Sequence, residues 1–235
     1  MTIIHNLNTT PAFNLAAEEH LLDTAAEPLF MLWRNEKAII VGKNQDTLAE
    51  IDRDYVQAQG IAVHRRITGG GAVFHDLGNI NYTLIEPEGG HFDDYAYFTA
   101  DLIDFLATLG VRAEQNERND VLIDGKKICG NAQCVRGGYI LHHGCILFDV
   151  DLDVLTRALT PGRDKLARNN VASVASRVTN IREHLRGDMS ALDFMNGFAR
   201  FMKERHGCDE SDLYGVEQIR KLAEEKYATW EWNYT

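Results

Sequence analysis

The feature that most constrains this chain is a run of three glycines, residues 69–71, which follows two arginines and precedes an apolar segment ending in His75. Consecutive glycines cost backbone entropy and pack no side chains, so proteins keep them where the backbone turns sharply or lies against a ligand. Such a loop can direct successive N–H groups at an anion, and Arg65 and Arg66 are permanently charged donors suited to phosphate or carboxylate. The stretch predicts a loop that binds an anionic small molecule, with a tight turn between strands as the alternative.

The composition excludes several classes of protein. With a net charge of -11, the 235-residue chain lacks the basic surface that broad nucleic-acid binding requires. No apolar run approaches the length of a membrane span, and the first residues lack the basic and apolar regions of a secretory signal. The cysteines include no Cys-x-x-Cys pair and are too few for a disulfide scaffold, so we interpret them as reduced thiols. We therefore expect a cytoplasmic protein without a nucleic-acid or membrane partner.

Strand-like segments outnumber helical ones as far as residue 149. The apolar patterning predicts strands at residues 2–6, 29–33, 38–41, 61–63, 80–85, 111–114, 121–123, 127–135 and 139–150. It predicts helices at residues 13–26, 50–59, 95–109, 152–159, 190–206 and 216–227. Several connections are of hairpin length, including 34–37. We expect an α/β protein of the α+β type, with a mixed, largely antiparallel β-sheet and helices packed on it.

Two further constellations suit catalysis. Asp120 follows Arg118 and Asn119 at the start of a strand, where it can bind a metal, orient an amine nucleophile or cap a turn. Lys127 also begins a strand and precedes the small residues 130–132, so its ammonium can lie beside a ligand held against them. A solvated lysine pair with Lys126 is the alternative.

Two other segments give weaker signals. Gly42 and Lys43 follow a strand, but the spacing of a Walker phosphate loop is absent. His142 and His143 are adjacent in a predicted strand, so they face opposite sides and cannot share one metal. At least one of the two is expected to be structural.

Read together and in order, these motifs resemble the lipoate-protein ligase family, and the resemblance covers nearly the whole chain. The matching segments are Phe-Asn-Leu-Ala-Ala-Glu-Glu (13–19), Arg-Arg-x-x-Gly-Gly-Gly-Ala-Val-Phe-His-Asp (65–76), Arg-Asn-Asp (118–120), Lys-x-x-Gly-Asn-Ala (127–132), His-His-Gly (142–144), Ser-Arg-Val-Thr-Asn (176–180) and Trp-Glu-Trp-Asn (230–233).

The resemblance implies the fold shared with biotin ligases and octanoyltransferases. It also implies a two-step reaction, in which lipoate and ATP give lipoyl-adenylate and a lysine of an acceptor domain then attacks it. The implied cofactors are ATP and Mg²⁺. The implied partners are the lipoyl-acceptor domains of 2-oxo acid dehydrogenase E2 subunits and the glycine cleavage H protein.

The resemblance also implies roles for particular residues. Lys127 matches the family lysine that contacts the lipoyl carbonyl and the α-phosphate, and Asp120 is placed to hold Mg²⁺ or to steer the incoming ammonium. The other residues implied to bind substrate or cofactor are Arg66, Gly69, Gly70, Gly71, His75, Asn119, Gly130 and Ala132. The dithiolane tail requires an apolar slot, which the sequence does not assign.

Residues 1–235 are expected to form one catalytic domain. Relatives often carry a smaller C-terminal domain after the Trp-Glu-Trp stretch, and we expect this chain to lack it. In relatives whose small domain is separate, adenylate formation depends on it. A separate accessory domain is therefore a further expected partner.

Three alternatives remain open at the level of the sequence. Cysteine-dependent octanoyl- or lipoyl-transferases use no ATP and carry their nucleophile where this chain has residues 118–120, which include no cysteine. Biotin ligases differ in the glycine-rich loop and lack the Arg-Asn-Asp and His-His-Gly segments. A non-catalytic module that binds lipoate or lipoyl-adenylate is the third.

Overall fold

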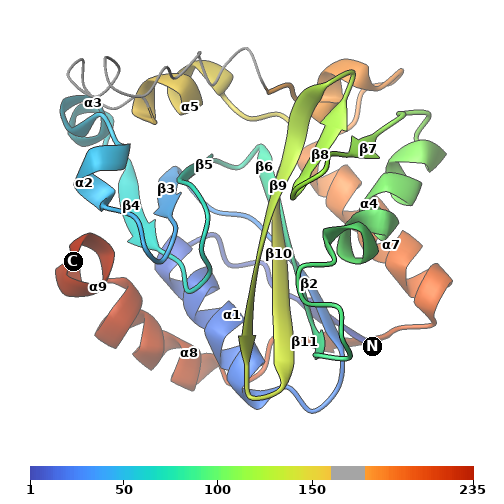
Figure 1. Ribbon diagram of the computed structural model, residues 1–235, viewed down its shortest axis with the longest axis horizontal. Coiled ribbons are helices and arrows are strands. Elements are labelled where there is room, and N and C mark those ends of the chain that lie inside the picture. The colour runs from blue at the N-terminus through green and yellow to red at the C-terminus, as the bar shows by residue number, and fades with distance from the viewer. Residues whose placement is uncertain (160–177) are drawn as a thin grey trace.

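The computed structural model describes residues 1–159 and 178–235 (Figure 1), so Ser176 and Arg177 of the predicted motif lie outside the described residues. Within them, the larger sheet has the order β11-β1-β2-β6-β10-β9-β8-β7 and the smaller sheet the order β4-β3-β5. The strands of the larger sheet are β1 Thr2–His5, β2 Leu29–Trp33, β6 Asn79–Pro87, β7 Glu114–Gln115, β8 Asp120–Ile123, β9 Lys126–Arg136, β10 Tyr139–Leu147 and β11 Asp209–Asp212. Those of the smaller sheet are β3 Ala38–Val41, β4 Ala62–Arg65 and β5 Val73–His75.

Helices cover both sheets. The α-helices are α1 Pro11–Thr24, α2 Thr47–Glu50, α3 Arg53–Ala58, α4 Tyr95–Thr108, α5 Leu152–Ala158, α7 Ala191–His206, α8 Val216–Leu222 and α9 Trp230–Tyr234. A 3₁₀ turn, η2, spans Ile181–His184, and a π-helical segment, η3, spans Ala223–Tyr227. Within the described residues, no helix is both long and apolar enough to span a bilayer.

The pairing confirms the expected fold class. Strand β1 pairs in parallel with β2 and β11, and β3 pairs in parallel with β4. The remaining ladders, from β2 through β6, β10, β9 and β8 to β7 and between β3 and β5, are antiparallel. This is a mixed, largely antiparallel architecture with packed helices.

The larger sheet is covered on both faces, which explains the continuous apolar run of β2. Alternate residues Phe30 and Leu32 pack in a core with helices α4 and α7, whereas Met31 and Trp33 pack in a second core with α1 and α8. Figure 1 shows α4 and α7 on one side of this sheet and α1 with the smaller sheet on the other. A third core joins the smaller sheet to α3 and α5.

The hairpin predicted at residues 34–37 is wrong. Strands β2 and β3 flank that segment, but β2 pairs with β1 and β6, whereas β3 pairs with β4 and β5. The chain crosses between sheets here, and the buried side chain of Asn35 hydrogen-bonds to Asn14 and His75. A short connection alone does not distinguish this crossing from a hairpin.

Other differences are local. The helix predicted at 50–59 divides into α2 and α3, because Asp52 caps a new helix by accepting from the backbone N–H of Tyr55. The strand predicted at 111–114 is limited to β7, which begins at Glu114. Strands β5 and β11 and helix α9 were not predicted as elements, because each is short and has no periodic pattern of its own.

Strand β9 has a bulge directly after Lys127. Val121 pairs with Cys129, but the next residue of β8, Leu122, pairs with Lys127, so Ile128 is an extra residue in the ladder. In regular alternation Lys127 and Gly130 would face opposite sides of the sheet. The bulge brings both to the side that faces the smaller sheet.

Candidate active site

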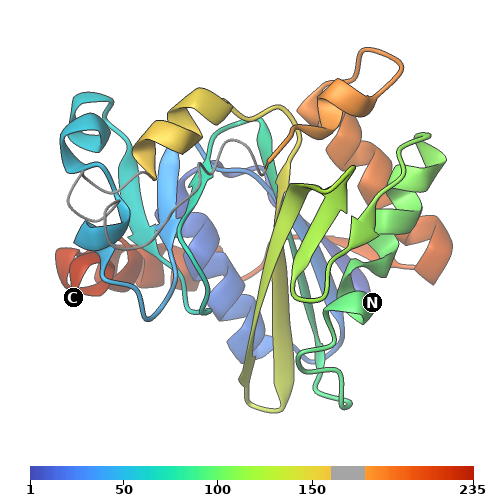
Figure 2. The same ribbon diagram turned by 45° about the horizontal axis from the view of Figure 1, so that its top comes forward.

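Two adjoining pockets lie between the two sheets. Figure 2 shows the smaller sheet on one side of the molecule's centre and the larger sheet on the other. The narrow pocket, of about 120 Å³, is bordered by Leu15, Trp33, Ile40, the glycine loop and the facing surfaces of β6, β9 and β10. The wide pocket, of about 440 Å³, is bordered by β8, α5, Phe74 and Val178. The residues shared by both pockets are Ala72, Val73, Lys127, Gly130 and Cys145. Lys127 therefore stands where the two meet.

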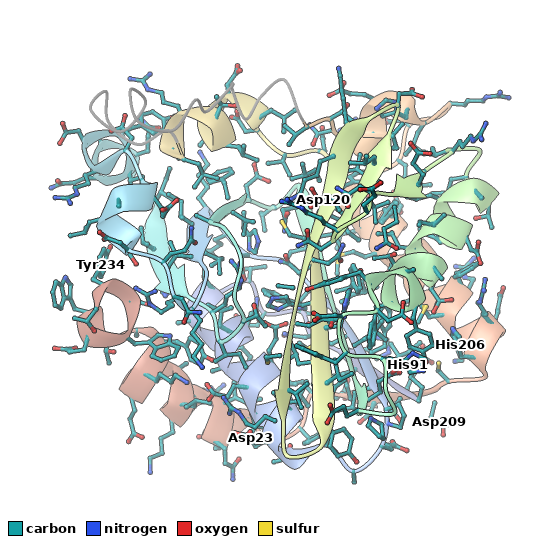
Figure 3. All side chains as sticks on the ribbon, viewed as in Figure 1. Asp23, His91, Asp120, His206, Asp209 and Tyr234 are labelled. Carbon is teal, nitrogen blue, oxygen red and sulfur yellow. The ribbon has the colours of Figure 1, made fainter. Side chains whose placement is uncertain are left out.

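Lys127 is held in place by a carboxylate. Its Nζ lies 2.7 Å from Oδ1 of Asp120, and both side chains are about one-third exposed or less. Figure 3 labels Asp120 beside the upper part of β9. A Cβ at Gly130 would lie 2.5 Å from Lys127 Nζ, so a residue without a side chain at 130 lets the lysine lie across the strand. The sequence predictions of Lys127, Asp120 and Gly130 thus fall together in space.

Asn119 is joined to the neighbouring strand by reciprocal hydrogen bonds. Its Nδ2 donates to the Asn131 carbonyl at 2.6 Å, and Asn131 Nδ2 donates to the Asn119 carbonyl at 2.8 Å. The hydroxyl of Tyr82 donates to Asn131 Oδ1, and a Cβ at Gly144 would lie 2.1 Å from the Tyr82 ring. The Arg-Asn-Asp, Gly-Asn-Ala and His-His-Gly motifs are therefore parts of one packed unit that positions Asp120.

Arg66 organises the glycine loop. Its Nη2 donates to the carbonyls of Gly69 and Gly71, and its Nε donates to Oγ1 of Thr68. Gly70 has φ +91°, a conformation that favours glycine, and it lines the narrow pocket with Gly71. Burial lowers the pKa of Arg66 to about 10, which leaves the guanidinium charged at neutral pH. Of the binding residues that the family resemblance implies, Gly69 alone borders neither pocket.

A buried relay connects helix α1 to this loop and was missed at the sequence level. Glu18 Oε1 accepts from Thr83 and lies 2.8 Å from His143 Nδ1. His143 Nε2 lies 2.8 Å from Thr68 Oγ1, which also receives the bond from Arg66. The Phe-Asn-Leu-Ala-Ala-Glu-Glu motif thus positions the glycine loop. The signal in the sequence was a pair of acidic residues directly after the apolar run of residues 15–17.

Arg65 does not border either pocket, so its interpretation as an anion-binding residue is wrong. Its guanidinium donates to the carbonyls of Gly42, Lys43, Gln45 and Trp232, and its backbone N–H donates to Asn233 Oδ1. A guanidinium saturated by carbonyls acts as a structural anchor. The Trp-Glu-Trp-Asn segment of α9 is the partner of this anchor.

Gly42 matters for packing and not as a Walker glycine. A Cβ on Gly42 would lie 2.1 Å from the carbonyl oxygen of Gly70, and Lys43 N donates to the carbonyl of Thr68. The backbone that follows β3 therefore lies directly against the glycine loop. The Gly-Lys pair was visible in the sequence, but only the fold shows what it contacts.

Two buried side-chain nitrogens on the narrow pocket have no hydrogen-bond partner among the described residues. They are His75 Nε2 and Asn81 Nδ2, and both residues are nearly inaccessible. Burial, together with the charge of Arg66, lowers the pKa of His75 to about 3, so the imidazole is neutral. Buried polar groups are normally satisfied, so these two atoms indicate a missing partner.

The histidine pair behaves as its spacing predicts. His142 faces away from the pockets, where it stacks on Phe98 and lies 3.1 Å from the Tyr82 hydroxyl. Burial keeps the pKa of His142 well below its usual value, as befits a structural residue. Across residues 1–159 and 178–235, no three His, Cys, Asp or Glu side chains gather closely enough to hold a metal by themselves.

The remaining predicted binding residues also reach the pockets. Asn119, Ala132 and His75 border the narrow pocket, and Asp120 borders the wide one. Trp33, Asn81 and Cys145 border the narrow pocket without having been predicted, because none of them lies in a motif to which the sequence assigns a ligand.

With this geometry the chain matches the family described as the lipoyl protein ligase A/B catalytic domain, over residues 10–203. It is 39% identical over 244 residues to the lipoate-protein ligase LplJ of Bacillus subtilis. The alignment covers all of this chain and 73% of the relative. The chain belongs to the lipoate-protein ligase family and is an enzyme of that class.

Solved structures support the same assignment. A bi-partite lipoate protein ligase from Thermoplasma acidophilum, reported with its E2 lipoyl domain, has a TM-score of 0.86 and 30% identity over 99% of this chain and 95% of that one. A lipoate-protein ligase A bound with ATP has a TM-score of 0.83 and 27% identity over 99% of this chain and 97% of that one.

Proposed function

We propose that this enzyme activates lipoate with ATP to form lipoyl-adenylate and pyrophosphate, and then transfers the lipoyl group to a lysine of a lipoyl-acceptor domain. The observation that carries the proposal is the Lys127–Asp120 pair at the junction of the two pockets. The names of the relatives and the ATP-bound neighbour support the choice of substrates.

The two pockets suit the two halves of an acyl-adenylate. The narrow pocket has apolar walls from Leu15, Trp33 and Ile40 and takes the acyl chain. The wide pocket takes the nucleotide, between β8 and the residues of α5. The mixed anhydride then lies beside Lys127.

In the first half-reaction, a carboxylate oxygen of lipoate attacks the α-phosphorus, and the bond from phosphorus to pyrophosphate breaks. Negative charge gathers on the phosphoryl oxygens, and a fixed ammonium in a partly buried site stabilises it. Lys127 supplies that ammonium, and Asp120 keeps it in position. Arg66 contributes a second positive charge and also holds the glycine loop, so that Gly70 and Gly71 approach the ligand through their backbone.

In the second half-reaction, Asp120 attracts the ammonium of the acceptor lysine through its negative charge, and the ammonium loses a proton to solvent. The resulting neutral amine attacks the acyl carbonyl, AMP leaves with the electrons of the C–O bond, and the nitrogen releases a second proton to solvent as the amide forms. Lys127 then stabilises the oxygen of the tetrahedral intermediate. Asn119, Gly130 and Ala132 shape the wall along which the acyl group lies.

The residues present fit a magnesium ion carried by the nucleotide. Mg²⁺ in nucleotide sites is held by one or two carboxylates together with phosphate oxygens. Among the described residues that border the pockets, Asp120 is the one carboxylate, and it would hold the ion. Mg²⁺ would supply charge neutralisation on the phosphates.

We also propose that residues 1–235 act as one catalytic domain. The expected acceptors are the lipoyl domains of 2-oxo acid dehydrogenase E2 subunits and the glycine cleavage H protein. The solved Thermoplasma neighbour, described together with its E2 lipoyl domain, supports the first of these.

The deciding experiment measures pyrophosphate release when the protein is mixed with ATP and lipoate, followed by mass spectrometry of an added lipoyl domain. We expect pyrophosphate release that depends on lipoate, and an acceptor heavier by one lipoyl group. Lipoylation from an acyl donor in the absence of ATP would favour a transferase. Binding without pyrophosphate or product would favour a non-catalytic module.

The cysteines are expected to be dispensable for this chemistry. Burial raises the pKa of Cys134 to about 11 and that of Cys129 well above its usual value, so neither is a thiolate at neutral pH. Cys129→Ser and Cys134→Ser should each transfer lipoate from lipoyl-adenylate within about threefold of the wild-type rate, with some loss of stability at 129. The assay is acceptor lipoylation with thermal unfolding alongside. A folded but inactive variant, together with an acyl-cysteine trapped on the wild type, would refute the adenylate mechanism.

A further inference from the structure

Two nitrogens on the narrow pocket have no partner among the described residues: His75 Nε2 and Asn81 Nδ2. Hydrogen bonds to neighbouring amides fix the tautomer of His75 and the orientation of the Asn81 amide, so that both nitrogens are donors. Asn14 Nδ2 shares its two N–H groups among two backbone carbonyls and Asn35 Oδ1, so the amide nitrogen of Asn35 faces His75 Nδ1 at 3.0 Å. Nδ1 of the neutral imidazole is thus the acceptor, and the proton is on Nε2.

The second donor is oriented in the same way. The Cys145 thiol lies 2.8 Å from Asn79 Oδ1, and burial raises the pKa of Cys145 to about 12, so the thiol keeps its proton and donates. Asn79 Nδ2 donates to Asn81 Oδ1 at 2.9 Å. The amide nitrogen of Asn81 is therefore left for the pocket.

The position of these donors along the pocket indicates which part of the substrate they meet. Gly130, beside Lys127 Nζ, pairs with Cys145, which pairs with Asn81. Asn81 is thus two strands from the lysine, roughly 10 Å at the usual strand spacing. Four methylene groups separate the carboxyl group of lipoate from its ring, and the extended chain together with the ring covers a similar distance. With the carboxyl group at Lys127, the ring reaches Asn81.

We propose that His75 Nε2–H and Asn81 Nδ2–H bind the sulfur atoms of the dithiolane ring and thereby select lipoate over acids that end in hydrocarbon. The inference rests on the proposed function, which supplies lipoate as the substrate. Sulfur is a weak acceptor, so the selectivity arises chiefly because a hydrocarbon leaves both buried donors unsatisfied. Sites of this kind reject analogues that lack the hydrogen-bonding atom.

The probe is 5-cyclopentylpentanoate, which has the shape of lipoate with carbon in place of both sulfurs. Affinities of lipoate, this analogue and octanoate are measured by titration calorimetry, and kcat/KM is measured for ATP-dependent ligation of each acid to a lipoyl domain. For the wild type we expect lipoate to exceed the carbocyclic analogue by about tenfold or more in both quantities.

The informative variants are Asn81→Leu and His75→Phe, which remove one donor each at similar volume. In each variant, the affinity and kcat/KM for lipoate should exceed those for the analogue by no more than about threefold. Circular dichroism confirms folding. Gln133→Leu is the control, because Gln133 is another buried amide of the same sheet, and its side chain bonds Asp93 N and His142 on the opposite face. It should leave the preference for lipoate unchanged.

The outcomes separate the inference from the proposed function. If the wild type ligates lipoate and the analogue equally well, the sulfur contact is overturned and the ligase function remains. The same holds if neither variant changes the wild-type preference for lipoate. If both variants lose affinity equally for all three acids, the donors bind the carboxyl end of the substrate, and the sulfur contact is again overturned. If the wild type ligates no acid, the proposed function fails as well.

Discussion

Lys127→Ala is expected to lower acceptor lipoylation from saturating lipoyl-adenylate by about 100- to 1,000-fold, the usual effect of removing one preorganised charge donor. The lysine is partly exposed and contacts Asp120 without filling a core cavity, so folding should be little affected. The loss should appear in both half-reactions, because the ammonium stands at the junction of the acyl and nucleotide pockets. Lipoylation rates with circular dichroism give the measurement.

Lys126→Ala is the matched control. Lys126 is exposed, borders neither pocket and lies next to Lys127 in the same strand. Its replacement should change the rate by less than about threefold. An inactive Lys126→Ala beside an active Lys127→Ala would mean that the register of β9 is displaced by one residue, and the site assignment would fail with it.

Gly70→Val is expected to abolish binding of lipoyl-adenylate while the protein still folds. At φ +91° a β-branched residue is strained by ~1–3 kcal/mol. Its Cβ would also lie 2.9 Å from Arg66 Nη2, the atom that holds the loop through Gly69 and Gly71. The loop must move to relieve both, and it then obstructs the narrow pocket. Calorimetric titration with lipoyl-adenylate measures the effect.

Gly187→Val controls for the loss of a glycine as such. Gly187 is exposed, has no left-handed φ, and a Cβ there would meet no atom within 4 Å. This variant should bind like the wild type. Near-normal affinity in Gly70→Val would show that the glycine loop is only a turn.

Most strands were predictable because a buried strand appears in the sequence as a local run of apolar residues. Residues 29–33 and 38–41 are continuous apolar runs, and both are strands with these bounds. Helices α4 and α7 likewise carry an apolar face at helical spacing, and the predicted bounds lie within about one residue of the observed ones. What failed was the connection at 34–37, because a short segment looks the same whether it reverses a strand or crosses to another sheet.

The candidate site was predictable in part for a different reason. Lys127, Asp120 and Arg66 belong to motifs whose joint order along the chain resembles the lipoate-protein ligase family, and that resemblance singled them out where residue type alone left structural roles open. Arg65 and Arg66 both donate to backbone carbonyls, but of the two only Arg66 borders a pocket. Because adjacent residues of an extended chain point in opposite directions, the side chains of Arg65 and Arg66 are expected to face different sides. The sequence does not indicate which of the two faces the ligand.

The sequence by itself determined the fold class, the positions of most strands and long helices, and the residues with chemistry to offer, because these depend on local periodicity and residue type. Only the tertiary structure decided how they meet. The bulge at Ile128 places Lys127 beside Gly130, the relay from Glu18 through His143 supports the glycine loop, and the amides of Asn35 and Asn79 orient the donors in the pocket. Each of these arrangements depends on contacts between residues far apart in the chain, and such contacts leave no pattern within any single segment.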